Sequence, residues 1–419
     1  MEQYIANLAI ENTSANFVLI RKTSNSLLNG GIDIQFDLTN EQETLVACSK
    51  IKQKLSEIKS DQLSTNVIIN DAIIKDLKFD NKSVFLQQDE YESKSMRYED
   101  IQDNLISKIN YLNSELETNS YVISYPTITY ITHNNVNRSY NKLPSVPRPF
   151  NTIKQVYARF SFPKDQTFIS TVETIMKKIN IKEFIYKLKS QILASMAKDV
   201  EDKWSFLIDV ESDNIIFAIT YNNKIIRYNY NDAVGLNYFV EKMSESMHKN
   251  ASEVHNMLAS LVRLKQSENF DKIIKQNEYL HLLNSSNNQF TDYISQEAKK
   301  IISFQCQDLG IDRLRIKQIK LQVPSWMAFS NEDFNDQNHH DFSVQNIAHL
   351  NKLKAKNNLL YISNCNRLIE QLVLTNSKVE QKASQSQTHT SEYEIIKQDN
   401  KLSFLGKILN LFKFKTKLA

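Results

Sequence analysis

Glycine scarcity restricts what this chain can build more than any other feature of the sequence. The 419 residues contain only five glycines, where ordinary usage of about 7% would give roughly 30. Loops that wrap phosphate groups with backbone N–H usually need glycine, because it reaches positive φ and lets the backbone approach closely. No GxxxxGK or GxGxxG stretch occurs, so the sequence has neither a P-loop nor a dinucleotide-binding fingerprint.

The composition predicts a globular chain of two or more domains, with 41% hydrophobic and 24% charged residues. There is no run of about 18 uncharged apolar residues, and the N-terminus lacks the features of a secretory signal. We therefore expect the body to stay in the cytoplasm. Cys48, Cys306 and Cys365 are too few and too far apart for a disulfide framework or a zinc site, and we expect buried thiols.

Charge is unevenly distributed along the chain. The net charge is +3, but residues 401–419 hold five lysines and no acid, so the preceding 400 residues carry a net charge of −2. A body that binds nucleic acid should be basic. The charge pattern therefore argues against a nucleic-acid partner.

The first part of the chain is expected to alternate strands and helices. Residues 4–10 and 15–21 suit a strand hairpin, and 66–70 suit a short buried strand. Between them a helix should start after Thr39, capped by Thr39 or Asn40. Its apolar stripe is expected to consist of Leu45, Cys48, Ile51, Leu55 and Ile58.

Residues 78–165 change character and predict a separate small α+β unit. Strands are expected at 83–87, 121–125 and 156–162, around a helix at 98–116. The proline-rich stretch 144–149 suits either a rigid surface connection or a polyproline ligand for a partner.

The opening pattern then recurs. We expect helices at 167–179 and 185–196, followed by a meander of strands at 205–209, 215–221 and 224–228 with a turn at Asn222-Asn223. Mostly helical sequence should follow over 236–307. The remaining elements are expected to be a strand at 316–323 and a final strand and helix within 359–374.

Residues 376–400 are polar and predict a flexible tether. The segment 401–419 that follows predicts a basic amphipathic helix lying on a membrane surface, although a helix docked on the body itself is the alternative. Its expected membrane-contacting residues are Leu402, Phe404, Leu405, Ile408, Leu409, Leu411 and Phe412, with Lys407, Lys413 and Lys417 on the polar side.

In this order, the elements resemble FtsA, the actin-like family that tethers the FtsZ division ring to the bacterial membrane. Individual stretches are similar too: NGGIDI at 29–34, MRYEDI at 96–101, YVISYPT at 121–127 and FLID at 206–209. The resemblance implies an actin-like (ribonuclease H-like) two-lobed α/β ATPase fold with an inserted small α+β domain and a C-terminal amphipathic helix. The resemblance implies that residues 1–77 begin subdomain 1A, that 78–165 form the inserted domain 1C and that 166–200 return to 1A. Residues 201–235 would form subdomain 2A and 236–305 the helical subdomain 2B, while 306–375 would complete 2A and return to 1A. The linker would be 376–400 and the membrane helix 401–419.

The phosphate loops depart from the family pattern. LAIENT at 8–13 stands where the family has L-D-I-G-T, and DVESDNI at 209–215 stands where it has D-I-G-G-G-T-T. The metal-orienting acid and the glycines are lost, and Glu211 and Asp213 would repel a polyphosphate unless a metal intervened. The positions that the resemblance assigns to a cofactor are Asn12, Thr13, Asp209, Ser212, Gly235 and Glu253.

We therefore expect ATP turnover to be absent or very slow and nucleotide binding to be weak or lost. The alternative is that Asn12, Thr13 and Ser212 hydrogen-bond phosphate through other geometry, with Mg²⁺ bridging to Asp209. The resemblance further implies that the C-terminal peptide of FtsZ binds the helical region and that the body self-associates into filaments. An active ATPase of the same fold and an unrelated lipid-surface scaffold remain the two competing hypotheses.

Other candidate motifs favour structural roles. His339-His340 has no third ligand at helical spacing and suits a solvated loop better than a metal site. Trp204 and Trp326 are expected to fill the core. Residues 313–320 largely alternate polar and apolar side chains, which predicts a half-exposed strand. No hydrolase signature such as GxSxG or HExxH is present.

Overall fold

The computed structural model describes residues 3–22, 27–59, 62–87, 97–134, 136–140, 143–144, 150–195, 204–264, 267–309, 315–324, 326–327, 329–335 and 342–346. Several sequence predictions lie outside these residues. They are the proline-rich stretch beyond Pro144, His339 and His340, Cys365, the elements within 359–374, the linker and the membrane helix.

The first sheet has the strand order β3-β2-β1-β4-β9. Its antiparallel meander consists of β1 (Gln3–Ile10), β2 (Ser14–Lys22) and β3 (Leu27–Asp37). β4 (Leu63–Ile69) runs parallel to β1, and β9 (Ile185–Leu188) runs parallel to β4. The predicted hairpin and the buried strand are therefore confirmed.

The second sheet repeats this arrangement, with the order β12-β11-β10-β13-β14. The meander here is β10 (Trp204–Val210), β11 (Ile215–Tyr221) and β12 (Lys224–Asn231), followed by the parallel strands β13 (Gln318–Gln322) and β14 (Ser343–Asn346). Two sheets with the same strand order and directions in one chain make up the two-lobed actin-like α/β fold. Asn222 and Asn223 both have positive φ, as the predicted tight turn requires.

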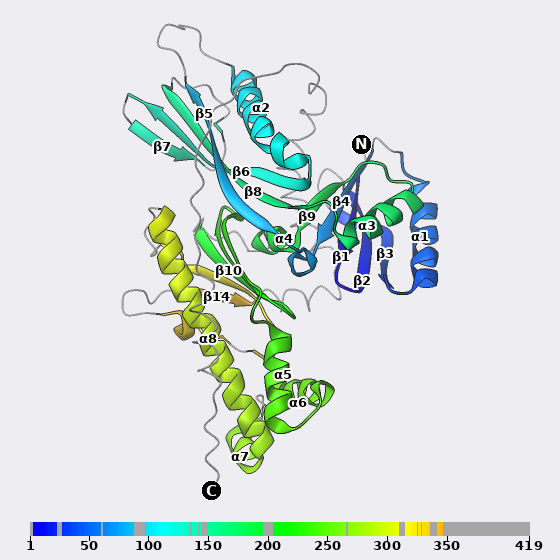
Figure 1. The fold of residues 1–419 in the computed structure, drawn as a ribbon, viewed down its shortest axis with the longest axis vertical. Helices are drawn as coiled ribbons and strands as arrows, with labels where there is room; N and C mark the ends of the chain where they lie inside the picture. Colours follow the sequence, from blue (N-terminus) through cyan, green and yellow to red (C-terminus); the bar gives the residue numbers. More distant parts are fainter. Residues whose placement is uncertain are drawn as a thin grey trace. The chain divides into compact units, whose positions relative to one another are not determined.

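A third, four-stranded antiparallel sheet interrupts the first lobe (Figure 1). Its strands are β5 (Lys78–Gln87), β8 (Thr152–Pro163), β6 (Ser120–His133) and β7 (Val136–Tyr140), in that spatial order. Helix α2 (Tyr98–Glu117) packs on this sheet. Leu105 and Ile109 of α2 share a hydrophobic core with Val84, Ile153 and Tyr157 of the strands.

The other helices pack on the two main sheets or on one another. They are α1 (Glu41–Leu55), α3 (Thr167–Lys178), α4 (Lys189–Ser195), α5 (Leu236–Met247), α6 (Ala251–Leu264), α7 (Phe270–Gln276) and α8 (Glu278–Leu309). Short 3₁₀ turns also occur at Asp71–Ile73 and Glu332–Phe334. Asn40 caps α1, as predicted, because its side chain accepts a hydrogen bond from the Glu43 N–H. None of the described helices is long and apolar enough to cross a membrane.

The predicted helix at 185–196 is only partly right. Residues 185–188 form β9, and the helix begins at Lys189. This segment is short and mainly apolar, so its local pattern fits either state, and parallel pairing with β4 decides in favour of the strand. β3, β7 and β14 had no counterpart among the predicted strands.

Two burial predictions were also wrong. Leu45 is 44% exposed, and Ile58 lies beyond the end of α1, so the buried stripe of that helix is Thr44, Ala47, Cys48, Ile51 and Leu55. The polar residues Gln318 and Lys320 of β13 are buried because both faces of this strand are covered, with the Lys320 Nζ reaching the Ala194 carbonyl of α4. The expected burial of Cys48, Cys306 and Trp204 is confirmed.

The two lobes share one hydrophobic core. Leu207, Ala218 and Ile225 of the second sheet belong to the same cluster of buried side chains as β1, β2 and α3. Tyr228 on β12 packs against Phe160 on β8, with ring centroids 5.1 Å apart. The Tyr125 hydroxyl donates to the Ile225 carbonyl at 3.2 Å. The inserted sheet thus contacts the edge of the second lobe.

Candidate functional site

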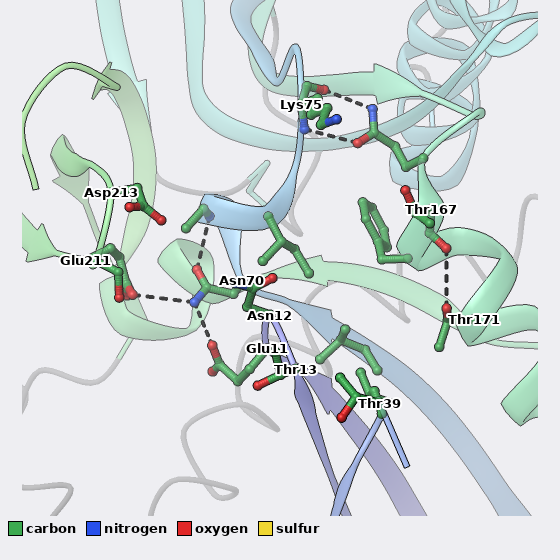
Figure 2. A pocket seen from close by; sticks show the side chains of 17 residues that line it. Glu11, Asn12, Thr13, Thr39, Asn70, Lys75, Thr167, Thr171, Glu211 and Asp213 are labelled. Atoms are coloured by element: carbon green, nitrogen blue, oxygen red, sulfur yellow. Dashed lines mark hydrogen bonds between the residues drawn. The ribbon is translucent and has the colours of Figure 1, made fainter. Parts of the chain in front are cut away.

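A cavity of about 650 Å³ lies where the first hairpin of each lobe turns. Figure 2 shows side chains from both hairpin turns and from α3 facing it. Its polar lining consists of Glu11, Asn12, Thr13, Thr39, Asn70, Lys75, Gln166, Thr167, Thr171, Glu211, Ser212 and Asp213. Clefts between two domains or lobes are common positions for ligand sites.

Both hairpin turns that line the cavity are tight and contain no glycine. The Glu11 N–H donates to the Ser14 carbonyl at 2.9 Å, and the Glu211 N–H donates to the Asn214 carbonyl at the same distance. β1 and β4 are parallel, so Glu11 and Asn70, which follow their carboxyl ends, come together. Each turn is closed by its own backbone hydrogen bonds.

A chain of polar contacts crosses the base of the cavity. The Asn70 side-chain amide donates to Glu11 at 2.6 Å and to Glu211 at 3.5 Å. Figure 2 shows Asn70 between the two carboxylates. Lys189, the first residue of α4, donates from its Nζ to the other oxygen of Glu211 and lies 3.8 Å from Asp209. This chain of contacts joins the two lobes.

Burial and charge shift the pKa values of two groups in this chain of contacts. Burial raises the pKa of the Asp209 carboxyl well above its usual range, and the nearby Lys189 ammonium offsets only part of that effect. Burial alone would lower the pKa of Lys189, but the charges of Asp209, Glu211 and Glu11 outweigh it and raise the pKa above its ordinary value. Lys189 is therefore a cation at every physiological pH.

Asp71 makes a second link between the lobes. It is completely buried, and its carboxyl accepts hydrogen bonds from the Ser190 N–H at 3.0 Å, the Ser190 hydroxyl at 2.6 Å and the Tyr228 hydroxyl at 3.0 Å. Burial raises the pKa of Asp71, and these three donors offset part of the rise. Because Tyr228 belongs to the second lobe, the contact adds to the connection made by Lys189.

The structure brings together three of the six residues predicted to bind a cofactor. Asn12, Thr13 and Ser212 line the cavity. Asp209 lies beneath the lining, with no exposed surface and, among the described residues, with neither carboxyl oxygen hydrogen-bonded. Glu253 is not among the lining residues. It takes part in a cap at the start of α6 instead, where its N–H donates to the Asn250 side chain and its carboxylate accepts from the Asn250 N–H.

Gly235 has a packing role beside the second turn. A Cβ at this position would lie 2.5 Å from backbone atoms of Ser212, Asp213 and Asn214. The close approach lets the Leu236 N–H donate to the Glu211 carbonyl at 2.9 Å and the Asn237 N–H donate to the Ser212 carbonyl at 2.7 Å. The first N–H groups of α5 are therefore already used and cannot bind an anion.

Sequence reasoning missed Asn70 and Lys189 as residues of the site. Lys189 was hidden inside the predicted helix 185–196, where a lysine suits an exposed face. Asn70 was included in the buried strand. The available signal was positional, because both residues follow the carboxyl end of a strand in the first sheet.

A magnesium–nucleotide complex needs cationic side chains or free backbone N–H groups around its phosphates. Among the described residues, the lining contains three carboxylates and one lysine, Lys75. Within the described part of the chain, no group of three or more His, Cys, Asp and Glu residues could hold a metal ion. With both hairpin turns closed and the N-terminus of α5 occupied, the residues present do not fit MgATP in this arrangement.

Neither a protein-family model nor a curated protein sequence matches this chain. Among solved structures, it is similar to the PilM–PilN type IV pilus biogenesis complex at 11% identity, over 76% of this chain and 80% of that chain, with a TM-score of 0.38. It is also similar to the ethanolamine utilization protein EutJ from Carboxydothermus hydrogenoformans, at 8% identity over 82% of this chain and 84% of that chain, with a TM-score of 0.33. A third similar structure is (R)-2-hydroxyglutaryl-CoA dehydratase component A from Acidaminococcus fermentans, at 9% identity over 87% of this chain and 99% of that chain, with a TM-score of 0.36. These TM-scores are too low to carry an argument, so the fold assignment rests on the strand order.

Proposed function

We propose that this protein is a non-hydrolysing actin-fold adaptor that holds a cytoskeletal polymer at the cytoplasmic face of a membrane. The observation that carries the proposal is the chain of contacts from Glu11 through Asn70 and Glu211 to Lys189, which occupies the base of the cavity with the protein's own side chains. A body with this fold and without a nucleotide site retains surfaces for binding other proteins. In this proposal, the role of the body is to recruit the polymer to the membrane.

The C-terminal segment supplies the membrane half of the proposal. Residues 401–419 combine apolar and lysine side chains without any acid. Burying an apolar side chain contributes about 1.5–3 kcal/mol before ordering costs, and each lysine near anionic lipid adds roughly 1 kcal/mol. One such segment binds reversibly, whereas many on one polymer bind far more tightly through avidity.

The partner in this proposal is the C-terminal peptide of FtsZ, following the sequence resemblance. Its receiving surface would be the helical region formed by α5 to α8. That region has a firm core, because Phe239 on α5 stacks on Phe290 of α8 and on Trp326, with ring centroids 5.1 and 5.3 Å apart. Self-association of the body into filaments would supply the avidity.

Removing residues 401–419 should abolish binding to anionic vesicles. The expected result is co-sedimentation of the full chain with phosphatidylglycerol-containing vesicles, a loss of at least about tenfold in the truncated chain, and co-sedimentation of FtsZ only when the full chain is present. A variant with Lys407, Lys413 and Lys417 changed to Gln is the matched control for charge. If the truncated chain pellets as well as the intact one, membrane recruitment by this segment is disproved.

MgATP should leave the thermal unfolding midpoint unchanged. A ligand that binds only the native state stabilises it by RT ln(1 + [L]/Kd), so millimolar ATP would raise the midpoint measurably if Kd were micromolar. The measurement is a thermal-shift titration with ATP, ADP and Mg²⁺ alone. A saturable rise with MgATP would instead support the active ATPase hypothesis.

A further inference from the structure

We infer that Lys189 is a built-in cation that replaces a metal–nucleotide complex as the link between the two lobes. Its ammonium lies among three carboxylates that come from both hairpins. Glu11 follows β1 in the first lobe, whereas Asp209 lies in β10 of the second lobe and Glu211 follows that strand. A positive charge that is part of the chain therefore stands where the lobes meet.

The position of Lys189 is rigidly defined by its neighbours. β9 places it directly after Leu188, whose N–H donates to the Gln191 side chain at 2.9 Å. On its other side, Ser190 is held by two hydrogen bonds to the buried Asp71. The Lys189 side chain is only 18% exposed, and its partner Glu211 is 15% exposed. Little rotamer freedom is left to lose when the ion pair forms.

Charge balance explains why one lysine is sufficient. A single ammonium cannot neutralise three carboxylates, but the three are not equally close, since the Lys189 Nζ contacts Glu211 directly and lies 3.8 Å from Asp209. Glu11 is exposed to water and also accepts from Asn70. Lys189 therefore forms a one-to-one ion pair mainly with the carboxylate of Glu211, which is 15% exposed.

The consequence is that the lobes are held together without metal or nucleotide. The Lys189–Glu211 pair is supported by the Asn70 bridge and by the Asp71–Tyr228 hydrogen bond, which also joins the two lobes. This inference rests on the proposed loss of nucleotide turnover but not on membrane recruitment. The full chain should therefore keep one interlobe arrangement, with polymer or membrane binding regulated elsewhere.

The test is the thermal unfolding of the full chain and four variants, with EDTA and with millimolar MgCl₂. Lys189→Met leaves a buried carboxylate unpaired, and the unfolding midpoint should fall by about 4–6 °C. Lys189→Met combined with Glu211→Gln removes both charges and should recover at least half of that loss. Lys75→Met removes an exposed lysine that lines the cavity and should change the midpoint by less than about 1 °C, because surface charges contribute little. The wild type should unfold at the same temperature in EDTA and in MgCl₂.

Two results would overturn the inference. One is a wild-type midpoint that rises with MgCl₂ or falls with EDTA, and this measurement needs no variant to fold. The other is a Lys189→Met chain that is as stable as the Lys75→Met chain. If Lys189→Met does not fold, Glu211→Gln alone must still lower the midpoint more than Lys75→Met does. Vesicle binding by the double variant separates this question from the proposed function, since binding should persist whatever holds the lobes together.

Discussion

Gly235→Ala should destabilise the protein by about 3 kcal/mol or more, although it adds a single methyl group. The new Cβ would lie 2.5 Å from three backbone groups of the β10–β11 turn. Overpacking usually costs about 1–3 kcal/mol when side chains can shift. Here the neighbouring atoms are backbone, so α5 must move away from the turn. The two hydrogen bonds from its first N–H groups would be lost with that movement.

Urea denaturation followed by circular dichroism measures this effect. Ser212→Ala lies in the same turn and serves as the matched control. This side chain is exposed, so the change should stay within about 0.5 kcal/mol. A Gly235→Ala chain as stable as this control would show that the turn and the helix are not in close contact.

Replacing Lys320 with Met should remove a large pH dependence of stability. Lys320 has no exposed surface, and its Nζ donates to two neutral groups, the Ala194 carbonyl at 2.6 Å and the Asn223 side chain at 3.3 Å. Burial lowers the pKa of Lys320 to about 7, from an ordinary value of 10.5. The native state therefore releases this proton at a lower pH than the unfolded state does.

The sign of the pH effect follows from proton counting. Between about pH 7 and pH 10.5, the unfolded chain still binds the proton that the native state has lost, so wild-type stability should rise with pH. The slope from this group is at most about 1.4 kcal/mol per pH unit. Below about pH 7 both states are protonated and the contribution is constant. In Lys320→Met this part of the slope should vanish.

The measurement is the free energy of unfolding of the wild type and Lys320→Met from about pH 6 to about pH 10. The difference between the two curves isolates this group from every other titrating side chain. Lys317→Met is the matched control, because Lys317 is exposed and lies just before the same strand. Its curve should keep the wild-type slope. Parallel curves for the wild type and Lys320→Met would contradict the lowered pKa of Lys320.

Most strands and helices could be predicted because their signals are local. The Asn222-Asn223 turn, the α3 helix and the first hairpin each follow from residue types that lie next to one another in the chain. β9 could not be separated from the helix after it, because four mainly apolar residues satisfy both patterns. The burial of Lys320 was equally hidden, since alternation in β13 does not reveal that both faces of the strand are covered.

The candidate site also has features that could be predicted from the sequence and features that could not. The loss of glycine from both phosphate loops can be read in the sequence, and three of the positions chosen there, Asn12, Thr13 and Ser212, line the cavity. Gly235 was assigned to the cofactor by the resemblance, but only the structure shows that a side chain at this position would collide with the backbone of the β10–β11 turn. The lysine that pairs with Glu211 could not be identified in advance, because its partner lies in the other lobe.

The amino-acid sequence by itself determined the order of the elements and the absence of glycine loops, because hairpins, caps and helical periodicity act over a few neighbouring residues. Tertiary structure alone decided that Asn70 lies within hydrogen-bond reach of Glu211, 141 residues away, and that Lys189 pairs with the same carboxylate. Such contacts depend on how two separate sheets are placed against each other. Burial at that shared interface raises the pKa of Asp209, and the carboxylates gathered there raise the pKa of Lys189.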